Sequence, residues 1–544
     1  MTRPALLSAL PRRLTATSAG YWALVGGVCL ATLLALVAGG GDPLLALAPV
    51  GAATIAYMMM RCPLRWSAVV LLVLLLGLDD YGDSVEKWHT PLVRLGEAMN
   101  TRLDSALGIP GLAISGMELI LVTLLGTWLY RRTAGSRLDS IGQVASARVL
   151  RDFVLLYLLA VAYAELNGLA HGQSFAPWKV RNLVHPLALF FLFQAAFRGP
   201  SDHRLLGAVV VWSAVYRAIL AFVVQRQAIA DTGGEFACAT NHGDSFLFAV
   251  ALFLLLADLM ERGDRKRLGR ALLLGPLIVL GMVENNRRIA WVMLAMSLLL
   301  AYLLSPMRGW KRAITRGAIV ALPALALYVA AGWNSESRIF APLRTFRSVS
   351  DSSIDGSTYW REVEIFNLAT SIKAAPVLGI GLGGEYTESI RNADISSLYK
   401  EYREWPHNTV LGLLLFFGVL AFSAMWALYG MVLFLATRCY RLSTSAEVRV
   451  AALSSIACIV CGLAMAWGDT GAHYTQFKVL VALAIAVTSK LVTVTGAWPS
   501  RRGPPAGAPA PPAASEHQGR APVAQTRACA LSAPCAASPA SSGT

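Results

Sequence analysis

Long apolar runs, separated by short polar segments, dominate the chain as far as residue 498. Each is about 17 to 25 residues long, which lets one α-helix cross a hydrocarbon core of roughly 30 Å. About 14 runs can be counted, centred near Val28, Ala52, Leu72, Val122, Leu159, Phe190, Val210, Leu252, Leu277, Met296, Leu325, Ala421, Cys458 and Leu483. Because the third, sixth and ninth are short, we predict an all-α polytopic membrane protein with about 12 to 14 transmembrane helices.

The composition of the 544 residues supports one membrane domain over several soluble ones, since 56% are hydrophobic and only 15% are charged. We assign residues 1–498 to this domain. From Pro499 the sequence becomes rich in Pro, Ala, Gly and Ser. Such a segment cannot bury enough apolar surface to order itself, so residues 499–544 are predicted to be a disordered cytoplasmic tail.

Positive charge gathers in alternate short segments between the runs, which predicts an orientation. The cations concerned are Arg3, Arg12, Arg13, Arg61, Arg65, Arg131, Arg132, Arg137, Arg262, Arg265, Lys266, Arg267, Arg308, Lys311, Arg312, Arg316, Arg438 and Arg441. The positive-inside rule places these segments, and both termini, in the cytoplasm. The net charge of +15 is therefore explained by topology, and no nucleic-acid partner is expected.

The longest segment between runs spans about 333–406 and faces the periplasm by the same parity. Within it, Tyr359–Ala374 has apolar residues at helical spacing before Pro376 ends the pattern, namely Trp360, Val363, Phe366 and Ile372. Two interpretations fit: an amphipathic helix on the membrane face, or a helix packed on its own loop. One large periplasmic loop is thus part of the predicted fold.

Charged and polar groups in or beside membrane spans cost several kcal/mol unless they are paired or face water, so each needs a reason. Those that come out toward the periplasmic side by counting spans are Arg217, Arg226, Asn285, Asn286, Arg287, Arg288, His407 and Asn408. Guanidinium groups suit a diphosphate because they are always charged and bind phosphate oxygens bidentately. Arg288, Arg287, Arg217 and Arg226 are therefore the candidate diphosphate-binding residues.

His407 is the candidate general base, because an imidazole that titrates near neutrality can accept a proton from a sugar hydroxyl. Structural alternatives remain open for each residue. His407 could cap a helix, Arg287 and Arg288 could anchor a helix end, and Arg217 could be a hydrogen-bond hub.

No metal or cofactor site is predicted. The other histidines show no ligand spacing, and the pair Asp79 and Asp80 is a weak metal signal by itself. Gly379–Gly384 reads G-I-G-L-G-G, but no Lys-Ser/Thr follows it, so a turn after the loop helix is favoured over a nucleotide loop.

Two sequence features resemble the O-antigen ligase and O-antigen polymerase superfamily: Arg361–Gly384, with its P-V-L-G-I-G-L-G core, and P-H-N-T-V-L-G at Pro406–Gly412, which leads directly into a span. The resemblance covers roughly residues 210–435. It implies a metal-independent inverting glycosyltransferase of the bacterial inner membrane, with undecaprenyl diphosphate as glycan carrier. His407 matches the family histidine and Arg288 a family arginine, while the earlier arginine is Arg217 or Arg226.

The expected function is therefore glycan transfer from undecaprenyl diphosphate to an acceptor hydroxyl at the periplasmic face. Arg361 and Asn408 are expected to contact substrate. The acceptor is either lipid A core or another carrier-linked glycan, and membrane lipid is the surrounding partner. A protein O-glycosylation ligase is an alternative. So is a polysaccharide flippase or transporter, although that class predicts internal repeats, which the sequence does not show.

The orientation can be tested with reporters that are active only in the periplasm. We expect activity for a fusion after Ser353 and none for fusions after Gly263 or Arg502, because of the cation asymmetry of the short segments. An active Gly263 fusion, at matched expression, would invert the topology and remove the candidate site from the periplasm.

Overall fold

The computed structural model describes most of the predicted membrane domain. The described residues are 18–38, 43–78, 93–100, 114–135, 139, 142–173, 177–234, 238–307, 309–335, 337, 340, 343, 347, 356–395 and 402–498. The predicted tail, 499–544, and the pair Asp79 and Asp80 lie outside them. The described residues are overwhelmingly helical and contain no β-strand.

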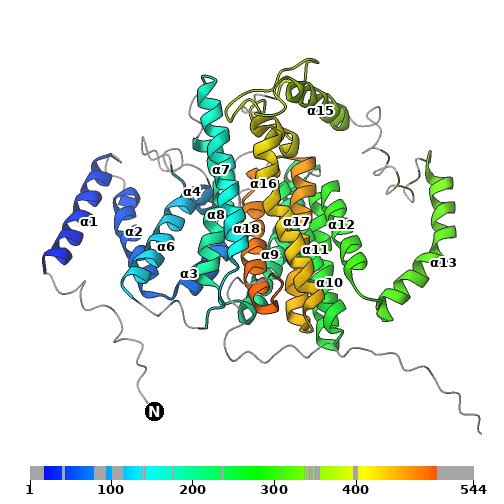
Figure 1. Ribbon diagram of the computed structural model, residues 1–544, viewed down its shortest axis with the longest axis horizontal. Coiled ribbons are helices and arrows are strands. Elements are labelled where there is room, and N and C mark those ends of the chain that lie inside the picture. The colour runs from blue at the N-terminus through cyan, green and yellow to red at the C-terminus, as the bar shows by residue number, and fades with distance from the viewer. Residues whose placement is uncertain are drawn as a thin grey trace, which may run out of the picture. The chain divides into compact units, whose positions relative to one another are not determined.

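The helices follow the apolar runs, and every predicted run centre falls inside one (Figure 1). They are α1 (Ser18–Ala38), α2 (Pro43–Arg61), α3 (Leu64–Gly77), α4 (Val93–Asn100), α6 (Gly116–Thr133), α7 (Arg148–Ala170), α8 (Pro177–Ala196), α9 (His203–Thr232), α10 (His242–Arg262), α11 (Arg265–Asn285), α12 (Arg288–Leu304), α13 (Gly309–Gly332), α15 (Gly356–Ala374), α16 (Thr409–Leu442), α17 (Ala446–Gly468) and α18 (Thr475–Thr495). Two short 3₁₀ turns, η2 (Pro200–Asp202) and η4 (Gly471–His473), complete the described elements.

Eight helices of the described part are long and apolar enough to cross a membrane: α7, α9, α10, α11, α13, α16, α17 and α18. Shorter apolar segments occur in α1, α3, α8 and α12. The described part of the chain is therefore all-helical and compatible with several membrane crossings.

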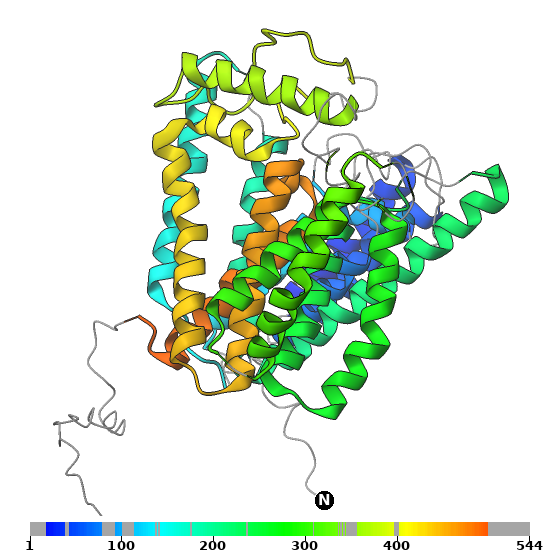
Figure 2. The same ribbon diagram turned by 90° about the vertical axis from the view of Figure 1, so that its right-hand side faces the viewer.

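The centre of the helical bundle is formed by α10, α17 and α18, which pack on one another and on α8, α12 and α16 (Figures 1 and 2). Side chains of α10 and α18 are buried there, since Phe246, Ala482 and Ala486 are all at most 3% exposed. Small residues let helix backbones approach closely, which is how helices associate in lipid. Cys458 and Cys461 of α17 are buried free thiols in this core.

Helix α16 is broken at Gly418, whose φ of 63° and ψ of 170° are not helical. The glycine-rich segment after α15 fills the break. The amides of Ile380 and Gly381 donate to the carbonyls of Leu415 and Phe416, both at 3.0 Å. Gly381 has φ +81°, and a Cβ there would lie 2.1 Å from a backbone nitrogen of α7, so only glycine fits. The predicted turn at Gly379–Gly384 is confirmed, and it joins α15 to α16.

Helix α15 lies across the end of the bundle, beside the first part of α16 (Figure 2). Its buried side includes Val363 and Leu368, whereas Trp360 and Phe366 are 40% and 50% exposed. The amide of Asn367 pairs with both backbone groups of Ile390, at 2.7 and 2.9 Å. The helix therefore packs on its own loop, one of the two interpretations offered by its sequence. Its contact with a membrane face stays a prediction.

Candidate functional site

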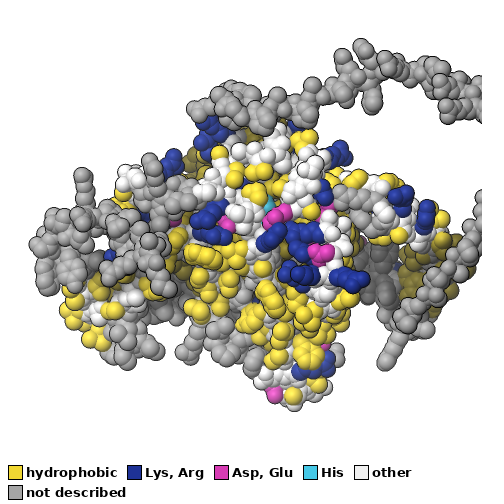
Figure 3. Space-filling model, turned by 90° about the horizontal axis from the view of Figure 1, so that it is seen from below, with side chains coloured by type: hydrophobic (Ala, Val, Ile, Leu, Met, Phe, Trp, Pro, Cys, Tyr) yellow, Lys and Arg dark blue, Asp and Glu magenta, His cyan; other side chains and the backbone are white. Residues whose placement is uncertain are grey.

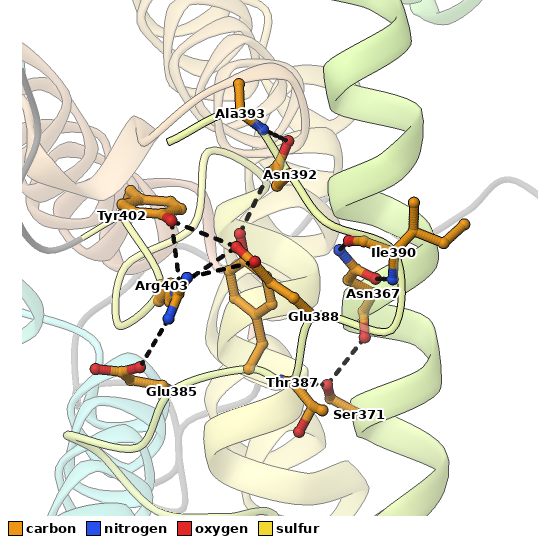
Figure 4. Close-up of polar contacts among 11 residues, drawn as sticks. Asn367, Ser371, Glu385, Thr387, Glu388, Ile390, Asn392, Ala393, Tyr402 and Arg403 are labelled. Atoms are coloured by element: carbon orange, nitrogen blue, oxygen red, sulfur yellow. Dashed lines mark hydrogen bonds and ion pairs between the residues drawn. The ribbon is translucent and has the colours of Figure 1, made fainter. Parts of the chain in front are cut away.

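The loop after α15 is held by a polar network that fixes the chain just before α16 (Figure 4). Arg403 donates to Glu388 at 3.3 Å and to the hydroxyl of Tyr402 at 3.1 Å. The amide of Thr387 donates to Ser371 Oγ of α15 at 2.9 Å. Because these contacts tie the loop both to itself and to α15, the following residues reach α16 along a defined path.

The P-H-N-T-V-L-G motif forms the junction between this loop and α16. A Cβ on Gly412 would lie 2.6 Å from Pro406 Cγ, so glycine permits the close packing of the two. Asn408 caps the helix by accepting from the amide of Leu411 at 3.0 Å. Thr409 Oγ1 donates to the backbone carbonyl of Asp469 at 3.0 Å. These contacts give Gly412, Asn408 and Thr409 structural roles, but none of them involves the side chain of His407.

His407 faces a buried carboxylate on α15. Its Nδ1 lies 3.4 Å from Glu364 Oε1, and its backbone amide donates to the same oxygen at 3.1 Å. The Glu364 side chain is only 4% exposed, while that of His407 is 36% exposed. A partly open imidazole is thus oriented by a carboxylate that water barely reaches.

The surroundings of His407 raise the pKa of its imidazole and so make it a stronger base. Burial lowers the pKa of this imidazole, but the hydrogen bond and charge of Glu364, aided by the charge of Asp469, outweigh it, so the pKa is raised. The positive charge of Arg361 lowers the pKa of His407, so the two side chains are close enough to interact electrostatically. A raised native pKa stabilises the fold below the usual histidine pKa, and this stabilisation is lost as the pH rises through the native value.

A second histidine and carboxylate lie at the same end of the bundle. Asp469, between α17 and η4, has Oδ2 2.8 Å from Nδ1 of His242, the first residue of α10. Tyr474 also donates to this oxygen at 3.4 Å. Burial raises the pKa of Asp469, but the nearby His242 and the Thr470 amide dominate and leave the pKa lowered. His242 and Asp469 were not singled out by the sequence.

Arg361 and Arg287 lie close enough to these histidines to interact with them electrostatically. Arg361 of α15 is within electrostatic range of both His407 and His242, and Arg287, which precedes α12, is within range of His242. The structure therefore brings Arg361 close to both histidines and Arg287 close to His242. Arg288, the first residue of α12, is exposed beside Arg287.

Arg217 and Arg226 occupy different surroundings, although both belong to α9. Arg217 is 1% exposed and makes a bidentate pair with Asp244 of α10, at 2.9 and 2.6 Å. This geometry supports the alternative that Arg217 is a structural hub between two helices. The Arg226 side chain is 56% exposed and lies 3.1 Å from Glu284. Diphosphate binding by either residue stays a prediction.

Three N–H groups in this region are buried without a hydrogen-bond partner among the described residues: Trp405 Nε1, Asn408 Nδ2 and Arg287 Nε. Two of them flank His407 in sequence. An unmet buried donor costs about 1–3 kcal/mol, so such groups are usually explained by a ligand, ion or water that supplies the acceptor. The site is therefore suited to an oxygen-rich ligand, held next to a histidine and carboxylate pair.

Within the described residues, no three His, Cys, Asp or Glu side chains gather in a way that could hold a metal ion. The weak candidate pair Asp79 and Asp80 falls outside these residues. No protein-family model matches the sequence, and no curated protein matches it.

The sequence missed Glu364, the partner of His407. Its signal was present as polar residues at 364, 367 and 371, spaced so that they share one side of a helix. All three are buried in the structure. The prediction for this helix rested on its apolar positions alone, so it did not include the buried carboxylate.

The pairing of His407 with Glu364 can be tested by NMR titration of the labelled imidazole. We expect Glu364→Gln to lower the pKa of His407, because the main group that raises it loses its charge and burial then prevails. Glu362→Gln, an exposed neighbour on α15, is the control and should leave the pKa nearly unchanged. Equal shifts in the two variants would show that Glu364 has no special contact with His407.

Proposed function

We propose that this chain is a bacterial inner-membrane glycosyltransferase that moves a glycan from undecaprenyl diphosphate to an acceptor hydroxyl at the periplasmic face. The main support is the pairing of His407 with the buried Glu364, beside N–H donors that have no acceptor among the described residues. The resemblance of Arg361–Gly384 and Pro406–Gly412 to the O-antigen ligase and polymerase superfamily supports the same chemistry.

In this mechanism His407 is the general base. When neutral, an imidazole whose Nδ1–H donates to Glu364 carries its lone pair on Nε2. The acceptor oxygen attacks the anomeric carbon and passes its proton to Nε2. The bond between the anomeric carbon and the diphosphate oxygen breaks, and its electron pair leaves with the diphosphate. Attack opposite the leaving group inverts the anomeric configuration, and Glu364 stabilises the imidazolium that forms.

The arginines bind the diphosphate and stabilise the charge that develops on it as it leaves. Arg361 and Arg287 have the strongest structural support. Arg361 interacts electrostatically with both His407 and His242, and Arg287 interacts with His242. Arg288 follows Arg287 at the start of α12 and is exposed. Of the two α9 candidates, Arg226 is better suited to reach a headgroup, since Arg217 is buried against Asp244.

The proposed membrane setting has 12 to 14 crossings, with the loop of α15 and both histidines on the periplasmic side and the termini in the cytoplasm. The exposed Trp360 and Phe366 of α15 are suited to the membrane interface. Lipid A core, a carrier-linked glycan and a protein hydroxyl are all candidate acceptors, and they are distinguished by which product accumulates.

We expect His407→Ala to lower transfer by about 10² to 10⁴, the usual contribution of a general base. His407→Gln should be similarly impaired, because an amide keeps a hydrogen bond but takes up no proton near neutral pH. Purified protein with a carrier-linked donor and each acceptor class gives both transfer and donor binding. Donor binding should persist in both variants.

The matched control is His171→Gln, since His171 is an exposed histidine at the C-terminal end of α7 and should tolerate the change. Near-normal transfer by correctly folded His407→Gln would exclude His407 as the base and restore its interpretation as a helix-end contact.

Arg288→Lys tests the donor site. It should transfer glycan much more slowly than wild type at equal protein level, because an ammonium group cannot reproduce the planar two-point contact of a guanidinium with phosphate. The same assay is read as donor affinity and turnover. Full activity in the lysine variant would make Arg288 an anchor of the helix end and assign the diphosphate to other residues.

A further inference from the structure

A cavity of about 550 Å³ lies between α9, α10, α11, α17 and α18. Its lining comes from the first halves of α9, α11 and α17, the second half of α10 and the middle of α18. The starts of α9, α11 and α17 lie at the opposite end of the bundle from α15 (Figure 1). The volume falls within the range of roughly 300–1,000 Å³ that is usual for sites of small organic ligands. The cavity plays no part in the proposed glycan transfer.

The lining changes from apolar to polar along the helix axes. Its inner part is formed by side chains such as Val211, Val250, Leu483 and Ala484. Its outer part contains the polar residues His203, Arg204, Asp258, Arg262, Arg267, Arg270 and Glu447. From Arg262 to Val250 the distance along α10 is about 18 Å at 1.5 Å per residue, close to the ~15 Å of hydrocarbon in one leaflet. The cavity is therefore graded in polarity, as one leaflet is.

The cavity is open at the side. Trp212 of α9 and Leu273 of α11 both line it and are 59% and 68% exposed. In helices that cross a membrane, exposed apolar side chains of this kind face lipid. An occupant can thus enter from the plane of the membrane with its apolar part first.

The polar end carries an excess of positive charge, because four arginines line it with only two carboxylates. Arg262 and Arg267 share Asp258, at 2.9 and 3.5 Å, and Arg204 lies 3.3 Å from Glu447. The balance stays positive when Asp264, which pairs with Arg267, is included. Figure 3, which views the structure from this end, shows Lys and Arg gathered between apolar surfaces.

Two groups at the polar end, Arg270 and His203, could make further interactions with a ligand. Arg270 is exposed and has no ion pair among the described residues. Both ring nitrogens of His203 are buried without a hydrogen-bond partner in the described part of the chain. A phosphate group at the polar end would accept a hydrogen bond from one imidazole N–H of His203. Its negative charge would also form an ion pair with Arg270.

We propose that this cavity binds an anionic glycerophospholipid. Its phosphate lies among Arg270, Arg204 and His203, and an acyl chain follows the apolar lining between α9, α10, α17 and α18. Charge complementarity selects the anionic headgroup, and the depth and side opening suit a lipid of the adjacent leaflet. This inference does not rest on glycan transfer, because the cavity and the His407 region lie at opposite ends of the bundle.

The test uses the full purified chain in detergent, with phosphatidylglycerol and phosphatidylcholine of matched acyl chains as probes. Native mass spectrometry gives the bound fraction, and thermal unfolding gives the stabilisation. We expect phosphatidylglycerol to bind at least tenfold more tightly than phosphatidylcholine and to raise the unfolding temperature. Glycerophosphate, which lacks acyl chains, should not compete.

Three variants locate the site. Arg270→Ala should weaken phosphatidylglycerol binding by about five- to tenfold, the usual value of one cation near an anionic headgroup. Arg265→Ala, an exposed arginine of α11 outside the lining, is the matched control and should bind normally. Ala208→Phe, at an exposed lining position of α9, should fill part of the cavity and weaken binding of the acyl chain.

Equal affinity for the two lipids would overturn the proposal, as would equal effects of Arg270→Ala and Arg265→Ala. A photoreactive acyl chain on phosphatidylglycerol provides an independent readout that does not depend on any variant. Its crosslinks should map to the lining of α9, α10, α17 or α18. Crosslinks spread over exposed helices such as α13 would show a general lipid shell and refute a defined site.

Discussion

The cost of leaving a polar group unpaired in an apolar interior governs the whole molecule. It explains why the described chain is helical and why buried charges such as Arg217, Lys478 and Glu261 have polar partners. Arg217 meets Asp244, Lys478 meets the side chain of Asn182 at 2.8 Å, and Glu261 accepts from Tyr440 and Arg449. Each pair joins helices that are adjacent in space, so the satisfied groups also fix which helices are neighbours.

The same cost makes the exceptions informative. Buried donors without partners appear at the His407 end of the bundle, at Trp405, Asn408 and Arg287, and a buried imidazole without partners appears at the other end, at His203. The first group adjoins an oriented histidine and several cations, which fits chemistry on an anionic glycan carrier. The second adjoins an apolar cavity and excess arginine, which fits retention of a lipid. The two ends of the bundle thus differ in which buried polar groups lack a hydrogen-bond partner.

Much of the fold could be predicted, because apolar run length alone places a helix at every predicted centre. The candidate site was predicted only in part. His407 and Arg287 were found because polar groups beside a span need a reason. Glu364, Asp469 and His242 were missed, since they approach one another only after α10, α15 and α17 pack together. Likewise, Arg217 was predicted to bind diphosphate because its structural partner, Asp244, lies 27 residues away on the next helix and could not be recognised from the sequence.

The break in α16 has a mechanical consequence. A broken helix leaves carbonyls without donors on one side and amides without acceptors on the other. Here Ile380 and Gly381 supply the donors, and the carbonyl of Pro376 accepts from the amide of Val419 at 2.9 Å. The loop therefore replaces a missing turn of the helix on which it rests. Separating the loop from α16 would leave both sets of backbone groups unpaired at once. The loop and the two halves of α16 are therefore expected to unfold as one cooperative unit.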